Sequence, residues 1–221
     1  DVYKRQFMTS GGWKLKYLHR QMLLSAAYTQ SAAYDAEKSK IDPQNRYLWR
    51  YAPRRLEAES IRDSMLAVSG ALDPKMFGPG TLDEGQLRRS IYFMIKRSRL
   101  ISMMQIFDQP EPLVSVGNRP STTIAPQALA FMNSPHVRRY AHQFAGRLLP
   151  LAAKSPEEAI RRGYLEAIGR PPTTEETADN VAFLKKQSES YTAEKKPQPM
   201  ELALADFCQV LMCLNDFIYV E

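Results

Sequence analysis

Four charged residues in the first half of the chain have spacings that could build a polar site. Arg55, Glu59 and Arg62 are separated by four and three residues, and Asp63 lies four residues after Glu59. On a helix these spacings place the side chains on one flank. Leu66 shares that flank, which indicates partial burial. Guanidinium and carboxylate groups in this arrangement could bind an anionic or sugar ligand, and the alternative is an ion-pair ladder that orients the helix.

The three histidines could act as acid, base or metal ligand, because imidazole titrates near neutral pH. His136 and His142 are six residues apart, which on one helix places them on roughly opposite sides. His19 follows an apolar position and precedes Arg20 at the edge of a helix. This spacing supports no metal site, so for each histidine the alternative is a role in packing or at a helix end.

A polar loop in the middle of the chain offers a second group of candidates. Residues 115–123 supply hydroxyls, backbone donors and the guanidinium of Arg119 just before a helix start at Pro126. Such a loop can bind an anion. It can equally be a hydrogen-bonded connection between elements, because it lacks a Gly-rich phosphate pattern. Asp108 and Glu111 suggest paired carboxylates, although the prolines on both sides of Glu111 also explain them as a rigid turn.

No nucleophile or metal-ligand spacing accompanies these charged residues, so the sequence reveals no reaction and leaves open whether the chain is an enzyme. Cys208 and Cys213 would point about 140° apart on one helix, so two free, half-buried thiols are expected. We predict no metal site. The candidate polar or ligand-binding residues are His19, Arg55, Glu59, Arg62, Asp63, Asp108 and Arg119.

The overall charge is positive but mixed. Thirty Lys and Arg against 24 Asp and Glu give a net charge of +6 and a pI near 9.3, which could suit an anionic partner. The basic residues are scattered among acidic ones, which favours a solvated mixed surface and argues against a nucleic-acid partner. The apolar stretches fall short of the roughly 20 residues that span a bilayer, so we expect no membrane span.

Apolar residues repeat with helical spacing over much of the chain. The clearest segments are residues 13–28, residues 54–72 with Gly70 near the end, and residues 201–214. Ser155 and Thr173 open two further helices, because each is followed by a Glu three residues on, as in a capping box. Further helices are predicted over residues 100–107, 126–133 and 135–149.

Three segments are not expected to be helical. Residues 30–45 have the composition of a surface loop, and residues 90–95 are dense in β-branched and aromatic residues, which is typical of a strand. The closing residues 217–220 are expected to dock in an extended form. The predicted fold is therefore mainly α, an irregular multi-helix domain with long loops and at most a short β element near residues 90–96.

Several ordered segments together resemble a planctomycete-type family, domain of unknown function fifteen-fifty-three. The resemblance covers nearly all of residues 7–221, so the series is more specific than any one motif. Residues 1–6 instead resemble a translated sequencing adapter found at the ends of environmental gene fragments. The segments that carry the resemblance include Leu18-His19-Arg20, Leu48-Trp49-Arg50, Arg54-Arg55-Leu56-Glu57-Ala58-Glu59, Arg88-Arg89-Ser90-Ile91-Tyr92, Pro126-Gln127-Ala128-Leu129 and Gly169-Arg170-Pro171-Pro172.

The resemblance implies a function within a larger protein. Proteins of this family are extracytoplasmic chains in which a haem-binding cytochrome c segment precedes this domain, so haem c and upstream domains of the same polypeptide are implied partners. This chain has no Cys-x-x-Cys-His, so no cofactor is expected on it. We expect a main helical domain over residues 7–150, truncated at its start, and a helical subdomain over 151–221. The leading hypothesis is a non-catalytic structural or ligand-presenting module of a cell-envelope protein. The alternative is an enzymatic or carbohydrate-processing domain with an Arg and carboxylate site.

Overall fold

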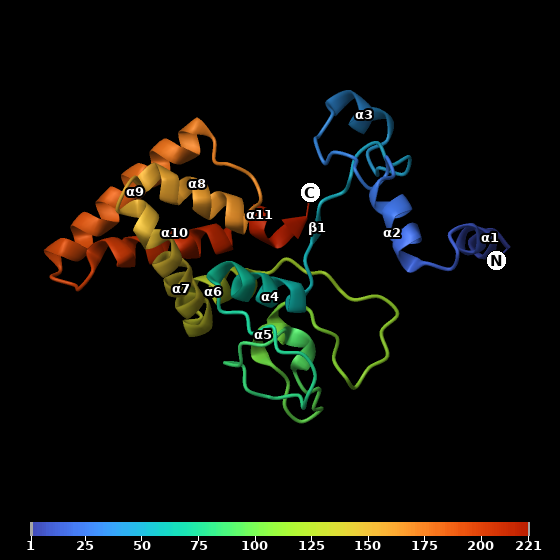
Figure 1. Cartoon of the computed structure of the whole chain (residues 1–221), viewed down its shortest axis with the longest axis horizontal. Coiled ribbons are helices and arrows are strands. Elements are labelled where there is room, and N and C mark those ends of the chain that lie inside the picture. Colours follow the sequence, from blue (N-terminus) through green and yellow to red (C-terminus); the bar gives the residue numbers. More distant parts are fainter. Residues whose placement is uncertain (1, 221) are drawn as a thin grey trace. The chain divides into compact units, whose positions relative to one another are not determined.

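The computed structural model describes residues 2–220 (Figure 1). Asp1, the first residue of the expected adapter, lies outside the described residues. The chain divides into two compact units, which meet in sequence between Arg54 and Arg55. Among the described residues there are eleven α-helices and one two-stranded sheet. The expected mainly α fold is therefore confirmed.

The first unit contains three short helices, α1 (Val2–Ser10), α2 (Leu15–Leu23) and α3 (Ala36–Ile41). Helix α2 lies within the helix predicted over residues 13–28 but is shorter at both ends, and none of its residues is buried. Helix α3 corrects the prediction that residues 30–45 form a loop throughout. It forms because the Asp35 carboxylate accepts hydrogen bonds from the backbone N–H groups of Glu37 and Lys38, at 3.0 and 3.1 Å.

Asp42 organises the end of the first unit. Its Oδ2 accepts a hydrogen bond from the backbone N–H of Tyr47 at 2.8 Å, and its carbonyl accepts one from Trp49 Nε1 at 2.9 Å. The guanidinium of Arg50 lies over the rings of Tyr34 and Trp49. These contacts hold residues 42–50 in a defined loop.

The second unit holds a hydrophobic core between long helices. Helix α7 packs against α4, α8 and α10, and α9 packs against α10. Large side chains such as Tyr140, Phe144 and Phe207 are completely buried there, and each buried side chain of this size contributes roughly 1.5–3 kcal/mol. The helices of this unit are α4 (Ala58–Ser69), α5 (Ser102–Ile106), α6 (Ala125–Asn133), α7 (Pro135–Ala152), α8 (Pro156–Ala167), α9 (Thr174–Ala193), α10 (Pro199–Cys213) and α11 (Asn215–Ile218).

The predicted helix ends are confirmed at several residues. Gly70 ends α4 with φ of 76°, a left-handed conformation that glycine adopts without strain. The Ser155 hydroxyl accepts a hydrogen bond from the Glu158 N–H at the start of α8. Thr173 and Glu176 form a reciprocal capping box at the start of α9, with bonds of 3.1 and 2.7 Å. Local capping chemistry therefore determines these boundaries.

The predicted strand over residues 90–95 is wrong. Ser90–Tyr92 instead forms the 3₁₀ helix η1, and only isolated bridges such as the one between Thr81 and Phe93 follow it. The reason lies in α4. The Asp63 carboxylate accepts hydrogen bonds from both the backbone N–H and the hydroxyl of Ser90, at 2.7 Å each. A side chain thus takes the backbone donor that a neighbouring strand would have used.

The end of the chain is only partly extended. Phe217 and Ile218 belong to α11, which corrects the prediction for those two residues, while β2 (Tyr219–Val220) pairs antiparallel with β1 (Arg54–Arg55). The expected C-terminal subdomain, residues 151–221, shares one hydrophobic core with the helices before it within the described residues. No helix within residues 2–220 combines the length and apolarity that crossing a bilayer requires.

Candidate functional site

Arg55 and Asp108, two of the predicted candidates, form a largely buried ion pair that the sequence did not predict. Arg55 Nη2 donates to Asp108 Oδ2, and only 6% and 13% of the two side chains are exposed. Arg55 Nη1 also donates to the Thr122 carbonyl and, at 2.9 Å, to Gln127 Oε1. Thr122 completes the group, because its N–H and hydroxyl each donate to Asp108 at 2.8 Å. The four residues form one connected network, named here the Arg55 network, in which the buried Arg55 Nε has no hydrogen-bond partner within the described residues.

Local structure places Asp108 where Arg55 can reach it. Asp108 follows the last residues of α5 with φ of 63°, and its N–H donates to the Gln105 carbonyl. Asp is one of the few residues that tolerate this left-handed conformation after a helix. Burial raises the pKa of Asp108, but hydrogen bonds from Thr122 and Arg55 outweigh burial, so the pKa lies below its usual value. Asp108 is therefore an ionised hydrogen-bond acceptor at neutral pH.

Arg119 and Glu59 form a second, more exposed network. Arg119 Nη1 lies 2.8 Å from Glu59 Oε2 and 3.2 Å from Glu57 Oε2. The hydrogen bond to Glu59 raises the pKa of Arg119 above its usual value. Glu57 and Glu59 lie at the start of α4, and Arg119 lies in the loop before α6. This pairing, together with the Arg55 network, holds the loop over residues 109–124 against the beginning of α4.

Arg62 and Asp63 form a third network in the middle of α4. The Arg62 guanidinium is buried, donates to the backbone carbonyls of Gln86 and Arg88 and lies 4.6 Å from the centre of the Phe93 ring. Burial lowers the pKa of Arg62. The neighbouring carboxylate of Asp63 binds Ser90. These contacts hold residues 86–93 against α4.

The sequence predicted an ion-pair ladder along α4 as the alternative to a ligand site. Arg62 Nη1 and Asp63 Oδ1 do lie 3.7 Å apart. The other contacts of Arg55, Glu59 and Arg62 are with loop residues distant in sequence, namely Thr122, Arg119 and Arg88. Arg55 and the flank of α4 thus fix two irregular loops, residues 86–93 and 109–124. Neither the ligand-site hypothesis nor the ion-pair ladder described these contacts.

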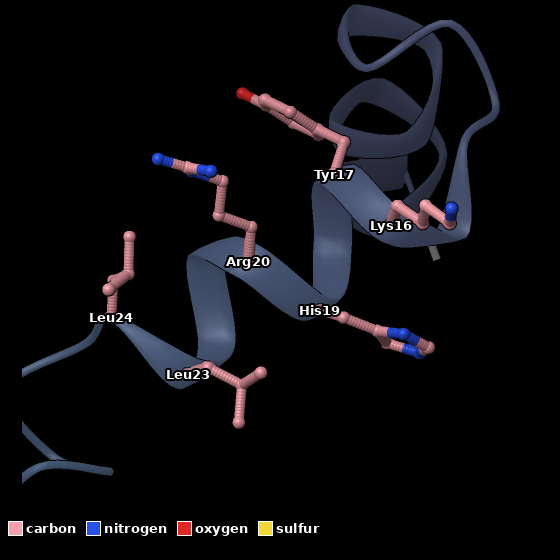
Figure 2. Close-up of a pocket in the computed structure, with 6 residues that line it drawn as sticks. All are labelled: Lys16, Tyr17, His19, Arg20, Leu23 and Leu24. Atoms are coloured by element: carbon pink, nitrogen blue, oxygen red, sulfur yellow. The ribbon is translucent and has the colours of Figure 1, made fainter.

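His19 belongs to the first unit, whereas the other six candidates belong to the second. It lies on α2 beside a shallow hollow lined by residues of that helix. Figure 2 shows the side chains of His19 and Leu23 pointing to one side of the helix and those of Tyr17, Arg20 and Leu24 pointing to the other. These side chains do not converge on a point where a ligand would be enclosed.

The remaining histidines lie on α7. His136 borders a hollow of about 290 Å³ with an apolar floor that includes Phe107 and Phe131. Glu84 lies at the edge of the same hollow, where its Oε1 accepts a hydrogen bond from the Ser102 N–H at 3.1 Å. His142 is half-buried, and burial lowers its pKa. Within residues 2–220 no group of three or more His, Cys, Asp or Glu side chains could hold a metal ion.

Sequence reasoning missed Gln127 as a member of the Arg55 network. Its amide accepts from Arg55 and donates to the Ile106 carbonyl at 3.0 Å, so it joins α6 to the end of α5. The only local signal is its place in the first turn of α6. Cys208 and Cys213 are free, as expected, but only Cys213 is half-buried as predicted, because Cys208 is completely buried. Burial raises the pKa of both thiols.

The fold and these networks define a mainly helical module in which buried polar side chains hold long loops in place. The chain belongs to the family described as "Protein of unknown function (DUF1553)", whose sequence profile matches residues 1–184. This match confirms the resemblance that the sequence indicated. Neither the curated proteins nor the solved structures contain a match to this chain.

Proposed function

We propose that this chain is a non-catalytic module of a larger haem-bearing cell-envelope protein, in which it packs against upstream domains and presents its loops to a ligand. One observation carries the proposal. The candidate charged residues of the second unit bind loop backbone or one another, as Arg55 does with Asp108 and Arg62 does with the Arg88 carbonyl. Groups engaged in this way position structure, and a reaction would need some of them free to contact a substrate.

The second unit contains two long loops with little regular secondary structure. Residues 109–124 contain no helix or strand. Within residues 71–100 the 3₁₀ helix η1 is the only named element. Long loops held by a rigid scaffold are where proteins usually place binding surfaces. The contacts from α4 supply such a scaffold, which supports a role in presentation.

The haem and the envelope location rest on the family resemblance. The chain itself has no Cys-x-x-Cys-His, so a covalently held haem would belong to another segment of the larger polypeptide. An anionic or carbohydrate ligand remains the ligand class that the basic charge and the polar loops suit.

The alternative function is an enzymatic or carbohydrate-processing domain. It requires Arg55 and Asp108 to exchange their present partners for a substrate. That exchange would expose a buried carboxylate, whose separation from its partners costs several kcal/mol. The alternative therefore predicts activity that depends on Asp108 in a chain that remains folded.

A comparison of this chain with a longer polypeptide that includes the upstream segments tests the proposal. We expect this chain to unfold cooperatively and to leave glycosidic and ester probes unchanged, and we expect the longer polypeptide to show haem absorption. Turnover by this chain that disappears in a folded Asp108→Asn variant, but not in the surface control Lys185→Gln, would establish the enzymatic alternative instead.

A further inference from the structure

Residues 75–99, named here the loop end, combine exposed apolar side chains with exposed cations. The segment contains six Lys and Arg residues and two acidic residues, which gives it a net charge of +4, and no acidic residue occurs from Gly85 to Phe107. In Figure 1 these residues form irregular loops beside α5, away from α8 and α9. Its large exposed apolar residues are Met76, Phe77, Ile91, Met94 and Ile95.

The loop end is held in one conformation by Arg88. The Arg88 guanidinium donates to the carbonyls of Lys75, Phe77 and Pro79, and it lies 3.5 Å from the centre of the Tyr92 ring. The main chain adds two bonds, from the Thr81 N–H to the Tyr92 carbonyl and from the Met94 N–H to the Thr81 carbonyl, at 3.0 and 2.8 Å. Residues 75–81 and 88–94 are therefore fixed side by side.

Phe77 has a conformation that the fold must impose. Its φ is 65°, which is a strained region for a bulky side chain, and 76% of the residue is exposed. Its N–H donates to the Tyr92 hydroxyl at 2.7 Å, and its carbonyl accepts from Arg88. The contacts that maintain the strain hold a phenyl ring in solvent, where it gains no packing. Backbone strain that is maintained by surrounding contacts is typical of functional sites.

The cations of the loop end are available to a partner. Lys75, Lys96, Arg97 and Arg99 are exposed and form no ion pair within the part of the chain that the structure describes. Lys96 and Arg97 directly follow Ile95, which is 72% exposed. Exposed apolar side chains and long cationic side chains are thus neighbours along the same loops.

We propose that the loop end docks on an anionic lipid bilayer. Apolar side chains flanked by Lys and Arg suit the boundary between headgroups and acyl chains, where the rings and aliphatic groups insert and the cations meet lipid phosphates. An acidic protein could also attract these cations. However, Lys is depleted in the centres of protein interfaces, and here Lys96 immediately follows the exposed Ile95. This inference does not depend on whether the module is catalytic.

Sedimentation of the whole chain with vesicles tests the proposal. We expect binding to vesicles of phosphatidylcholine and phosphatidylglycerol in equal parts, weaker binding to phosphatidylcholine alone, and loss of binding at high salt. Replacing both Lys96 and Arg97 by Gln should weaken binding roughly 10-fold to 30-fold. The matched charge control replaces Lys185 and Lys186 on α9 by Gln and should bind like the unaltered chain.

The Phe77→Gly variant separates docking from folding. Glycine adopts a φ of 65° without strain, so the free energy of unfolding should stay the same or rise. Binding to the anionic vesicles should nevertheless fall roughly 10-fold, because the inserted ring is lost. The apolar control is Leu129→Gln on α6, which should leave vesicle binding unchanged.

Three results would overturn the proposal: no sedimentation with anionic vesicles, equal binding to both vesicle types, or unchanged binding by Phe77→Gly. The last result, combined with a loss of binding in the Lys96 and Arg97 variant, would indicate a purely electrostatic surface of the kind that an acidic protein recognises.

Discussion

Arg55 and Asp108 form an ion pair between side chains that are 53 residues apart in the chain. Because both side chains are largely buried, removing one partner leaves the other charge without compensation. We predict that Arg55→Met destabilises the fold by about 3 kcal/mol in urea unfolding. Replacing Asp108 by Leu in the same chain should restore part of that loss. Arg119→Met, which removes a more exposed pair, should cost less than about 1 kcal/mol, and a larger cost there than at Arg55 would contradict this ranking.

Arg62 is expected to determine the order of residues 86–93. Arg62→Met keeps much of the side chain's volume but removes the donors to the Gln86 and Arg88 carbonyls. Amide hydrogen exchange at Leu87 and Phe93 should accelerate more than exchange in α10, because those loop contacts are lost while the helical core remains. The matched control is Arg161→Met on the exposed side of α8. Uniform acceleration across both regions would show that Arg62 supports the whole fold and not this loop.

Two helical glycines should respond to alanine with opposite signs. A Cβ at Gly163 would lie 2.9 Å from the Phe207 ring and 3.2 Å from Leu211, so Gly163→Ala should destabilise the chain by roughly 1–3 kcal/mol. A Cβ at Gly146 would meet no neighbour within 4 Å, so Gly146→Ala should stabilise the chain by up to about 1 kcal/mol. Thermal unfolding of the two variants checks the signs, and stabilisation by Gly163→Ala would show that α8 and α10 pack less closely than the structure indicates.

The Arg170 and Glu176 pair should make stability depend on pH in acid. Hydrogen bonds from Arg170 lower the pKa of Glu176 from 4.5 to about 2. Because the folded pKa is the lower one, the stabilisation is fully present above about pH 4.5 and is lost as the pH falls toward 2. Glu176→Gln should flatten this part of the profile measured by urea unfolding between those pH values, whereas Glu175→Gln on the same turn should retain it. An unchanged slope in Glu176→Gln would assign the acid sensitivity to other carboxylates.

The charged residues of the candidate site were predicted from the sequence only in part. The spacing placed Arg55, Glu59 and Arg62 on one flank of a helix, but only Glu59 and Arg62 lie on α4, because Arg55 belongs to β1 and α4 begins at Ala58. It could not indicate the partners, because the Thr122 and Arg88 carbonyls come from loops whose paths no local pattern defines. The ligand-site hypothesis for these residues stays a prediction, and their observed contacts favour a positioning role.

The sequence by itself determined the longer helices and the ends at Gly70, Ser155 and Thr173, because apolar periodicity and capping depend on residues within a few positions of one another. The strand predicted over residues 90–95 failed for the complementary reason. Its composition favours a strand, but Asp63, 27 residues earlier in the chain, binds the backbone of Ser90. Only the tertiary structure decided which distant side chains satisfy the loop backbone, because those contacts join residues far apart in the sequence, as Asp63 and Ser90 do.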